Sequence, residues 1–200
     1  MTMAEKKSYK RRGSTSSLLL TLALLVIIAL VIIFLPDNAS AKQPVTSTTE
    51  QQDDIEATTL IHAGDKAPDF TVTMLDGRDV TLSKLQGKPT LLIFWATWCP
   101  PCRDELAHLQ EGVIDVYGDK INVLPISRGE RRDVVVNFLD KMGYTFAVGL
   151  DGDQSIYRKY ATNYIPRCWV IDSKGVVVYA GVGYDDAIAA EVKAALNKAL

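Results

Sequence analysis

The hydrophobic and polar positions along the chain change character twice before residue 61. Residues 18–35, LLLTLALLVIIALVIIFL, are apolar except for Thr21 and carry no charge. Residues 36–60 are polar and rich in Ser, Thr and Gln, a composition that buries too little apolar surface to fold. From residue 61 onward, short apolar runs alternate with helical patterns. The pattern therefore predicts an apolar segment, a flexible linker over 36–60 and one domain over 61–200.

Within the domain the patterns predict a series of strands and helices. Alternating residues on both sides of Asp76-Gly77 indicate a β-hairpin. The continuous apolar run over residues 90–95, TLLIFW, is typical of a strand that is buried on both faces. Further strands are expected at 121–126, 146–150, 168–171 and 176–179, and helices at 100–116, 133–142, 154–160 and from Asp185 onward. This order predicts an α/β sandwich around a mixed sheet.

The apolar segment 18–35 is long enough to cross a bilayer. A helix of this length measures roughly 27 Å at about 1.5 Å per residue, close to the thickness of the hydrocarbon layer. Because basic residues cluster within 1–13, the positive-inside tendency predicts a cytoplasmic tail over 1–17 and a single-pass anchor. A cleaved signal that ends at Ala39-Ser40-Ala41 is the alternative, although this apolar stretch is long for a removable signal. Both interpretations place the domain on the periplasmic or extracytoplasmic side of a bacterial inner membrane.

The net charge of −2 hides an asymmetry between the two parts of the chain. Residues 1–13 hold five basic residues and one acid, which leaves 17 basic and 23 acidic residues in the remainder. The basic run is short, terminal and free of the interleaved aromatic residues that nucleic-acid binding uses. No nucleic-acid partner is therefore expected.

The stretch WCPPCRDE holds Cys99 and Cys102, two of the three cysteines. A zinc site needs four ligands, and Cys168, His62 and His108 do not complete a set with suitable spacing, so no metal is expected. A structural disulfide would close a ring of only four residues and constrain the unfolded chain little. The strand over 90–95 instead delivers Cys99 to a helix N-terminus, where amides and the helix dipole stabilise a thiolate. The pair is therefore predicted to be redox-active, with Cys99 as the exposed nucleophile, Cys102 as the resolving thiol and no further cofactor.

Three stretches together carry a family resemblance: GDKAPDFTVTMLDGRDVTLSKLQGK, FWATWCPPCRDE and YIPRCWVIDSKG. They resemble the TlpA/ResA-type membrane-anchored thiol:disulfide oxidoreductases of the thioredoxin superfamily, and the resemblance covers residues 61–200. It implies a thioredoxin-like three-layer sandwich with a mixed central sheet, an N-terminal β-hairpin extension and a central insertion at about 118–150. It also implies that Ile165-Pro166 is a cis peptide beside the cysteine pair.

The resemblance also implies roles for side chains around the pair. Residues expected to contact the substrate chain are Trp98, Pro100, Pro101, Ile165 and Pro166. The two prolines after Cys99 also suit the first turn of a helix. Thioredoxin's buried aspartate is replaced here by Ile93, but Glu105 matches a glutamate to which the family often gives the proton-acceptor role. A solvated glutamate on the helix is the alternative for Glu105.

The two residues after the cis-proline depart from the small hydroxyl residues that are common in the family. Arg167 is expected to meet an acidic substrate, to pair with Glu105 or to lie in solvent. Cys168 is expected to be a small core residue. His108 and the charged stretch 128–133 are expected at the solvated surface.

The resemblance implies a monomeric reductase of protein disulfides that takes electrons from a membrane donor of the DsbD/CcdA type. Cytochrome c maturation or envelope redox homeostasis is the expected setting. A disulfide-introducing oxidase is the alternative, because potentials vary widely among CxxC proteins of this fold. A peroxiredoxin-like thiol peroxidase is disfavoured, since neither Cys99 nor Cys102 has a proline seven residues ahead of it.

Overall fold

The computed structural model of the protein describes residues 24–26 and 46–200. Of the predicted membrane span, only the helical residues 24–26 are included, and the remainder of 1–45 lies outside the described residues. Residues 46–200 form one compact unit. Within the two described ranges, no helix is both long and apolar enough to span a bilayer.

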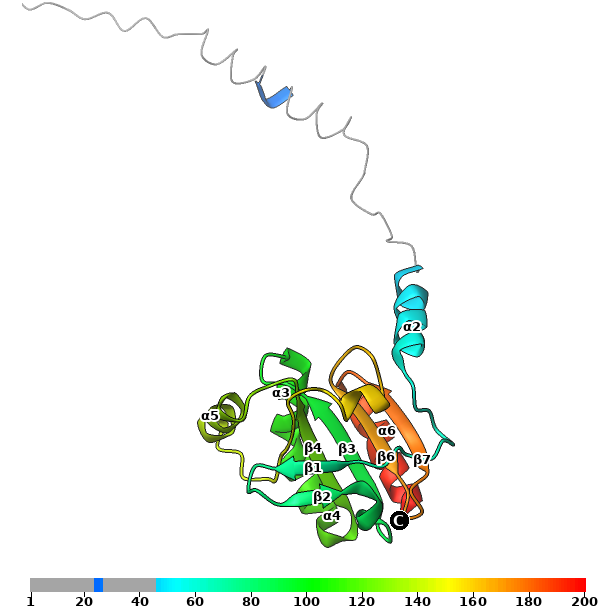
Figure 1. Ribbon diagram of the computed structural model, residues 1–200. Coiled ribbons are helices and arrows are strands. Elements are labelled where there is room, and N and C mark those ends of the chain that lie inside the picture. Colours follow the sequence, from blue (N-terminus) through cyan, green and yellow to red (C-terminus); the bar gives the residue numbers. More distant parts are fainter. Residues whose placement is uncertain (1–23, 27–45) are drawn as a thin grey trace, which may run out of the picture. The chain divides into compact units, whose positions relative to one another are not determined.

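A seven-stranded mixed sheet forms the centre of the domain, in the order β2-β1-β5-β4-β3-β6-β7 (Figure 1). The strands are β1 (Thr71–Met74), β2 (Asp79–Thr81), β3 (Thr90–Trp95), β4 (Asn122–Arg128), β5 (Gly149–Asp151), β6 (Arg167–Ile171) and β7 (Val177–Val182). Strands β3, β4 and β5 are parallel, whereas the other neighbouring pairs are antiparallel. The predicted hairpin is β1–β2, so the hairpin and the mixed sheet are both confirmed.

Five α-helical segments accompany the sheet in the described part of the chain. They are α2 (Thr46–Thr58), α3 (Pro100–Leu109), α4 (Asp115–Tyr117), α5 (Arg132–Met142) and α6 (Asp186–Ala199). A π-helical turn, Gln110–Ile114, joins α3 to α4, so the helix predicted over 100–116 is present but carries one wide turn. The short helix predicted at 154–160 is a 3₁₀ turn, Tyr157–Lys159.

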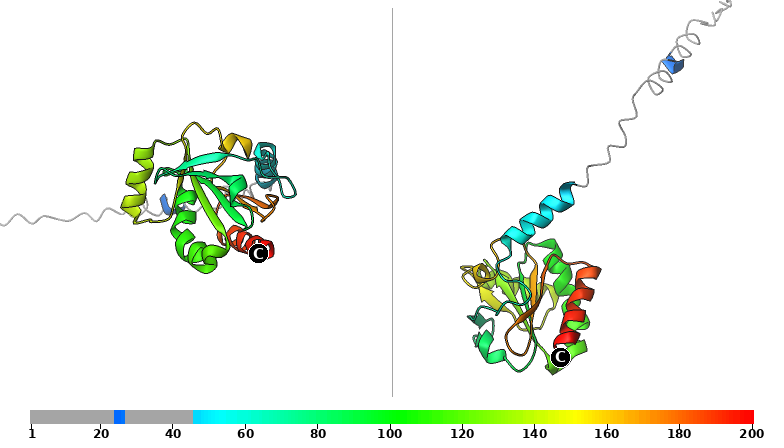
Figure 2. Two further views of the ribbon diagram at one scale, coloured as in Figure 1. Left: turned by 60° about the horizontal axis from the view of Figure 1, so that its bottom comes forward. Right: turned by 90° about the vertical axis from the view of Figure 1, so that its right-hand side faces the viewer.

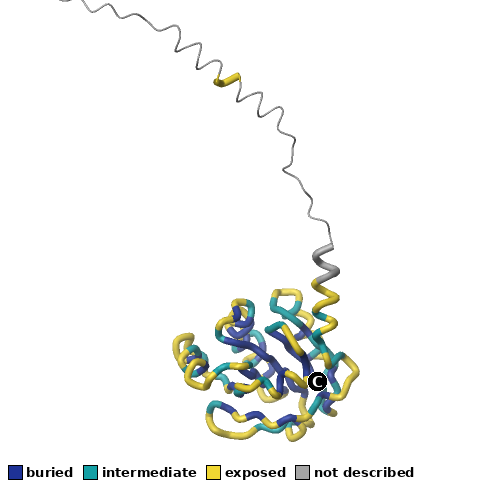
Figure 3. Tube along the Cα trace, turned by 45° about the horizontal axis from the view of Figure 1, so that its top comes forward, coloured by how far each residue is buried: buried dark blue, intermediate teal, exposed yellow. Residues whose placement is uncertain are grey.

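Helices α3 and α6 cover one face of the sheet (Figure 2). Strand β3 is buried along its whole length, and its alternate residues Leu91, Ile93 and Trp95 join the core beneath these helices. On the opposite face Phe94 packs in an aromatic cluster with Tyr157, Tyr160 and Trp169. In Figure 3 the buried residues gather at the centre of the domain. A strand with apolar residues on both faces is therefore what positions the cysteine pair that follows it.

The segment 118–150, expected as a central insertion, contains β4, α5 and β5. Strand β4 is the middle strand of the sheet, whereas α5 and β5 connect it to the hairpin, since β5 pairs with both β4 and β1. Helix α5 ends at Gly143, which adopts the left-handed conformation (φ 71°) that glycine accommodates without strain. This predicted helix end is confirmed.

The prediction of a flexible linker over 36–60 is wrong from Thr46 onward. Residues Thr46–Thr58 form α2, and the compact unit begins at Thr46 instead of residue 61. Residues 51–58 of α2 are mostly exposed, and the polar composition of the helix gave no sign of order (Figure 3). It is held at its C-terminal end by hydrogen bonds from Arg167 of β6 to the hydroxyls of Thr58 and Thr59. Local composition does not encode such a distant partner.

Candidate active site

The two cysteines of the CxxC stretch form a disulfide at the start of α3. Cys99 is the N-cap of the helix and has an extended backbone conformation, and its sulfur accepts a hydrogen bond from the amide of Cys102 at 3.3 Å. Pro100 and Pro101 occupy the first helical positions, where a missing N–H is tolerated. The predicted placement of the pair at a helix N-terminus is confirmed. Such a terminus stabilises a thiolate on Cys99 when the disulfide opens.

Cys99 is not exposed in this disulfide form, contrary to the sequence-based expectation. Only 3% of its surface is accessible, and its sulfur, besides its bond to Cys102, lies 3.6 Å from the carbonyl oxygen of Ile165. The peptide bond between Ile165 and Pro166 is cis, as the family resemblance implied. Pro166 is buried. Trp98, which directly precedes Cys99, is instead the most exposed large apolar residue of the site, at 65%. Residues 163–166, called the 163–166 loop below, thus place one backbone carbonyl, that of Ile165, against the sulfur of Cys99.

Glu105 lies one helical turn after Cys102 and is buried, with 7% of its surface exposed. One of its carboxylate oxygens, Oε2, has no hydrogen-bond partner. Burial raises the pKa of Glu105 from its ordinary value of 4.5 to about 8, because the charged form loses its hydration. The structure thus excludes a solvated helix glutamate.

A cavity of about 400 Å³ opens between α3, the π-helical turn and α6, and Glu105 lines it. Its other lining residues include His108, Leu109, Tyr184, Ile188 and Lys193. His108 is exposed as predicted, and its ring stacks on Tyr184 with the centroids 5.9 Å apart. The buried carboxyl group therefore has a path to the surface that does not pass the disulfide.

The turn between β3 and Cys99 is fixed by Glu130, which the sequence reasoning missed. The carboxylate of Glu130 accepts hydrogen bonds from the amide and the hydroxyl of Thr97, at 2.8 and 2.5 Å, and from the hydroxyl of Ser127. Nearby, the guanidinium of Arg128 stacks over the ring of Tyr157 at 4.1 Å. The predicted solvated surface over 128–133 is therefore wrong for Arg128 and Glu130. Residues 131–133 are exposed as expected.

Arg167 is neither in solvent nor paired with Glu105, so the expectations for it are wrong. It is 1% exposed, and its guanidinium donates hydrogen bonds to the carbonyl of Asn163 and to Thr58 and Thr59, each at 2.7 or 2.8 Å. Its neighbour Cys168 points to the other face of the sheet, into the core beneath α3 and α6, and is 1% exposed. Burial raises the pKa of the Cys168 thiol well above its ordinary value. Cys168 is thus the core residue that the sequence predicted.

Known proteins are similar to this chain in sequence and in fold. Residues 63–180 match the model of the AhpC/TSA family. The ResA thiol-disulfide oxidoreductase of Bacillus thuringiensis (strain Al Hakam) is 35% identical over 121 residues, which are 60% of this chain and 69% of that protein. This chain is a ResA/TlpA-type member of the AhpC/TSA family.

Solved structures agree with this membership. A putative protein disulfide isomerase from Bacteroides thetaiotaomicron is 33% identical, with a TM-score of 0.68 over 72% of this chain and 92% of that one. A putative thiol:disulfide interchange protein DsbE from Chlorobium tepidum is 28% identical, with a TM-score of 0.64 over 70% and 98%. The thioredoxin-like fold of the ResA/TlpA-type protein is thereby confirmed. The predicted activity, that of a thiol:disulfide oxidoreductase acting on protein disulfides, is confirmed as well.

Proposed function

We propose that this ResA/TlpA-type protein is an extracytoplasmic reductase of protein disulfides, anchored in a bacterial inner membrane by residues 18–35. The observation that carries the proposal is the buried carboxyl group of Glu105, one helical turn from the buried Cys102. Its pKa of about 8 lies close to the value of about 8.5 for an ordinary thiol. A group so matched can exchange a proton with Cys102 at about pH 8, where a substantial fraction of the carboxyl group is ionised.

The reduction then proceeds in two exchange steps. The thiolate of Cys99 attacks one sulfur of the substrate disulfide, which forms a mixed disulfide and releases the other substrate sulfur as a thiolate that takes a proton. Cys102 gives its proton to Glu105, and its thiolate attacks the sulfur of Cys99. The Cys99–Cys102 disulfide forms, and the second substrate sulfur leaves as a thiolate that takes up the proton held by Glu105. Two electrons pass from the protein to the substrate, and a donor dithiol must restore the pair.

The substrate chain is proposed to lie along the surface around Cys99. Trp98 is exposed there, Pro100 and Pro101 begin the helix beside it, and the partly buried Ile165 precedes Pro166. These side chains offer an apolar surface next to the reactive sulfur. A protein disulfide with apolar flanking residues suits such a surface better than a charged one.

The direction of electron flow is tested by the reduction potential and by the thiol state in cells. A reductase should equilibrate with glutathione near the thioredoxin value, about −270 mV, and Cys99 should be found as a thiol in intact cells. Trapping free thiols with an alkylating reagent and counting labelled cysteines provides the second measurement. A potential near about −120 mV together with a disulfide in cells would instead identify a disulfide-introducing oxidase.

Reducing equivalents are proposed to come from a membrane donor of the DsbD/CcdA type, and cytochrome c maturation or envelope redox homeostasis is the proposed setting. An exported compartment is oxidising, so the dithiol persists only if it is fed electrons. An anchor would raise the effective concentration of the domain near a membrane-embedded donor. The protein is proposed to act as a monomer.

The proposed topology predicts that the N-terminal tail stays attached and cytoplasmic. N-terminal sequencing of the mature protein from membranes should find the tail intact, and external protease should release the domain by cutting between residues 36 and 45. A mature chain that begins at Lys42 would establish a cleaved signal in place of the anchor.

A further inference from the structure

The 163–166 loop, whose Ile165 carbonyl lies against the sulfur of Cys99, is held in an unfavourable backbone conformation at one residue. Tyr164 has a φ of 68°, in the left-handed region that residues other than glycine seldom occupy. Such a conformation persists only where surrounding contacts determine it. The hydroxyl of Tyr157 supplies one contact, since it lies 2.6 Å from the carbonyl oxygens of both Asn163 and Tyr164.

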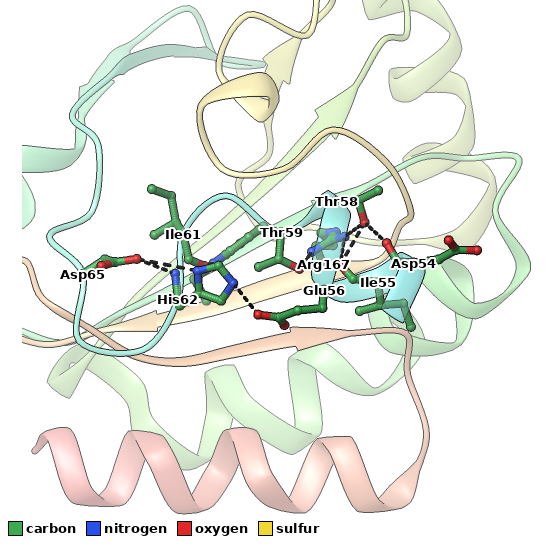
Figure 4. A network of polar contacts seen from close by, with 10 residues as sticks. Asp54, Ile55, Glu56, Thr58, Thr59, Ile61, His62, Asp65 and Arg167 are labelled. Atoms are coloured by element: carbon green, nitrogen blue, oxygen red, sulfur yellow. Dashed lines mark hydrogen bonds and ion pairs between the residues drawn. The ribbon is translucent and has the colours of Figure 1, made fainter. Parts of the chain in front are cut away.

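Arg167 supplies the second contact to the loop, and Figure 4 shows its side chain directed at Thr58 and Thr59 at the end of α2. Its Nε donates to the carbonyl of Asn163 at 2.8 Å, while Nη1 and Nη2 donate to Thr59 Oγ1 and Thr58 Oγ1, each at 2.7 Å. Both threonine hydroxyls in turn donate to the carbonyl of Ile55 in the last turns of α2. One guanidinium therefore joins the end of the helix to the start of the loop.

Backbone contacts reinforce the same link. The amide of Thr162 donates to the carbonyl of Thr58 at 2.9 Å, and the amide of Leu60 donates to the carbonyl of Tyr160 at 3.0 Å. Residues Thr59 and Ala161 form an isolated antiparallel bridge between these segments. The chain that leaves α2 thus runs beside the residues that lead into the loop.

The buried guanidinium of Arg167 has an unusual set of hydrogen-bond partners. It is buried, and its partners are neutral oxygens instead of a carboxylate. Burial lowers the pKa of Arg167, which reflects the free energy needed to remove the cation from water. The oxygens at the C-terminal end of α2 carry partial negative charge and offset this penalty. The oxygens at the helix end therefore stabilise the buried guanidinium, and the guanidinium in turn binds the end of α2 to β6.

We propose that Arg167 is a positioning residue through which α2 sets the 163–166 loop against Cys99 and thereby prepares the surface that receives a protein disulfide. This inference rests on the proposed function, because the loop is taken as part of the substrate surface. Small disulfides need only the sulfur of Cys99, whereas a protein chain needs the loop as well. Loss of the link should accordingly affect large and small substrates differently.

The test compares insulin with hydroxyethyl disulfide as substrates of the purified full-length chain. In Arg167→Met the KM for insulin should rise about tenfold while kcat stays within about twofold, because a displaced loop no longer presents its surface. The rate with hydroxyethyl disulfide should not fall. Arg167→Lys keeps the charge and one donor group, so it should restore part of the affinity.

Two further variants separate positioning from stability. Ile171→Ala creates a cavity at the opposite end of β6, where Ile171 pairs with Thr90, and should lower the melting temperature without changing either KM. The double variant Thr58→Val, Thr59→Val keeps Arg167 and its bond to the carbonyl of Asn163 but removes the two hydroxyl acceptors on the α2 side, and it should reproduce the rise in KM even if Arg167→Met does not fold. A KM for insulin within twofold of wild type in the double variant would overturn the proposal.

The outcome for wild type distinguishes the two proposals. If the wild-type dithiol does not reduce insulin, the proposed reductase fails. The same variants are then compared as disulfides that oxidise a reduced peptide. A selective rise in KM for the peptide in that direction supports the role of Arg167, and an unchanged KM rejects it.

Discussion

Replacing Cys99 by serine should abolish disulfide reduction, with a loss of at least about a thousandfold in the rate of insulin reduction. A hydroxyl at the helix N-terminus cannot form the mixed disulfide through which both exchange steps pass. Cys102→Ser should also stop turnover, but for a different reason: the first step still occurs, and the mixed disulfide on Cys99 accumulates. Insulin turbidity measures the first effect, and non-reducing gels with mass spectrometry measure the second.

The matched control is Cys168→Ala, which removes the remaining thiol. Cys168 is buried opposite Ile93 in the sheet, so its loss should leave the redox activity intact and lower the free energy of unfolding by about 1 kcal/mol. Wild-type turnover by Cys99→Ser would refute the enzymatic role of the pair. A mixed disulfide that forms on Cys168 would show that the third thiol is not merely part of the core.

The disulfide form should become less stable as the pH rises from about 4.5 to about 8. The folded-state pKa of Glu105 lies near 8 and the unfolded-state value near 4.5, so over this interval the unfolded chain has released a proton that the folded protein retains. Each pKa unit corresponds to about 1.4 kcal/mol, so the free energy of unfolding should fall by about 4 to 5 kcal/mol across the interval. Urea unfolding of the oxidised protein at several pH values measures it.

Glu105→Gln should flatten this pH dependence, because the amide is neutral at every pH in the interval. The variant should therefore be more stable than wild type near pH 8 and reduce disulfides more slowly, since Cys102 loses its proton acceptor. Glu111→Gln is the matched control, because Glu111 is an exposed glutamate of the π-helical turn. If wild type and Glu105→Gln show the same dependence of stability on pH, the carboxyl group is hydrated and its proposed role is wrong.

The elements that the sequence predicted well are those with local causes. Strand β3 needs only an uninterrupted apolar run, and its bounds, Thr90–Trp95, coincide with that run. Helix α6 begins where Asp185 can cap it, and the carboxylate of Asp185 accepts a hydrogen bond from the amide of Ile188. The position of Cys99 at a helix start follows from such a strand and the two prolines after it.

The features that the sequence did not predict depend on partners far away in the chain. Glu105 could have been solvated or buried, because helix spacing does not say which elements close over that face. Arg167 sits beside Cys168 in a sequence that gives no sign of the threonines more than 100 residues earlier. Helix α2 has few apolar residues, so composition alone assigned it to a linker.

The covered state of Cys99 has a similar origin. A thiol at a helix start is expected to face solvent, and the 163–166 loop places the carbonyl of Ile165 against it from more than 60 residues away. Glu130 likewise reaches the turn at Thr97 across 33 residues. Packing between distant segments thus determines how the redox pair is enclosed. The local sequence pattern determines only that the pair lies at the start of a helix.

The contacts between α2 and β6 also set an order of assembly. The hydrogen bonds from Arg167 to Thr59 and Thr58 close chain loops of 108 and 109 residues, and long loops carry an entropic penalty that delays their closure. During synthesis α2 emerges first, yet its partner arginine is made only after most of the sheet. We therefore expect the C-terminal end of α2 to dock late, once β6 is in place. A chain that stops before residue 167 leaves α2 without the cation that holds it.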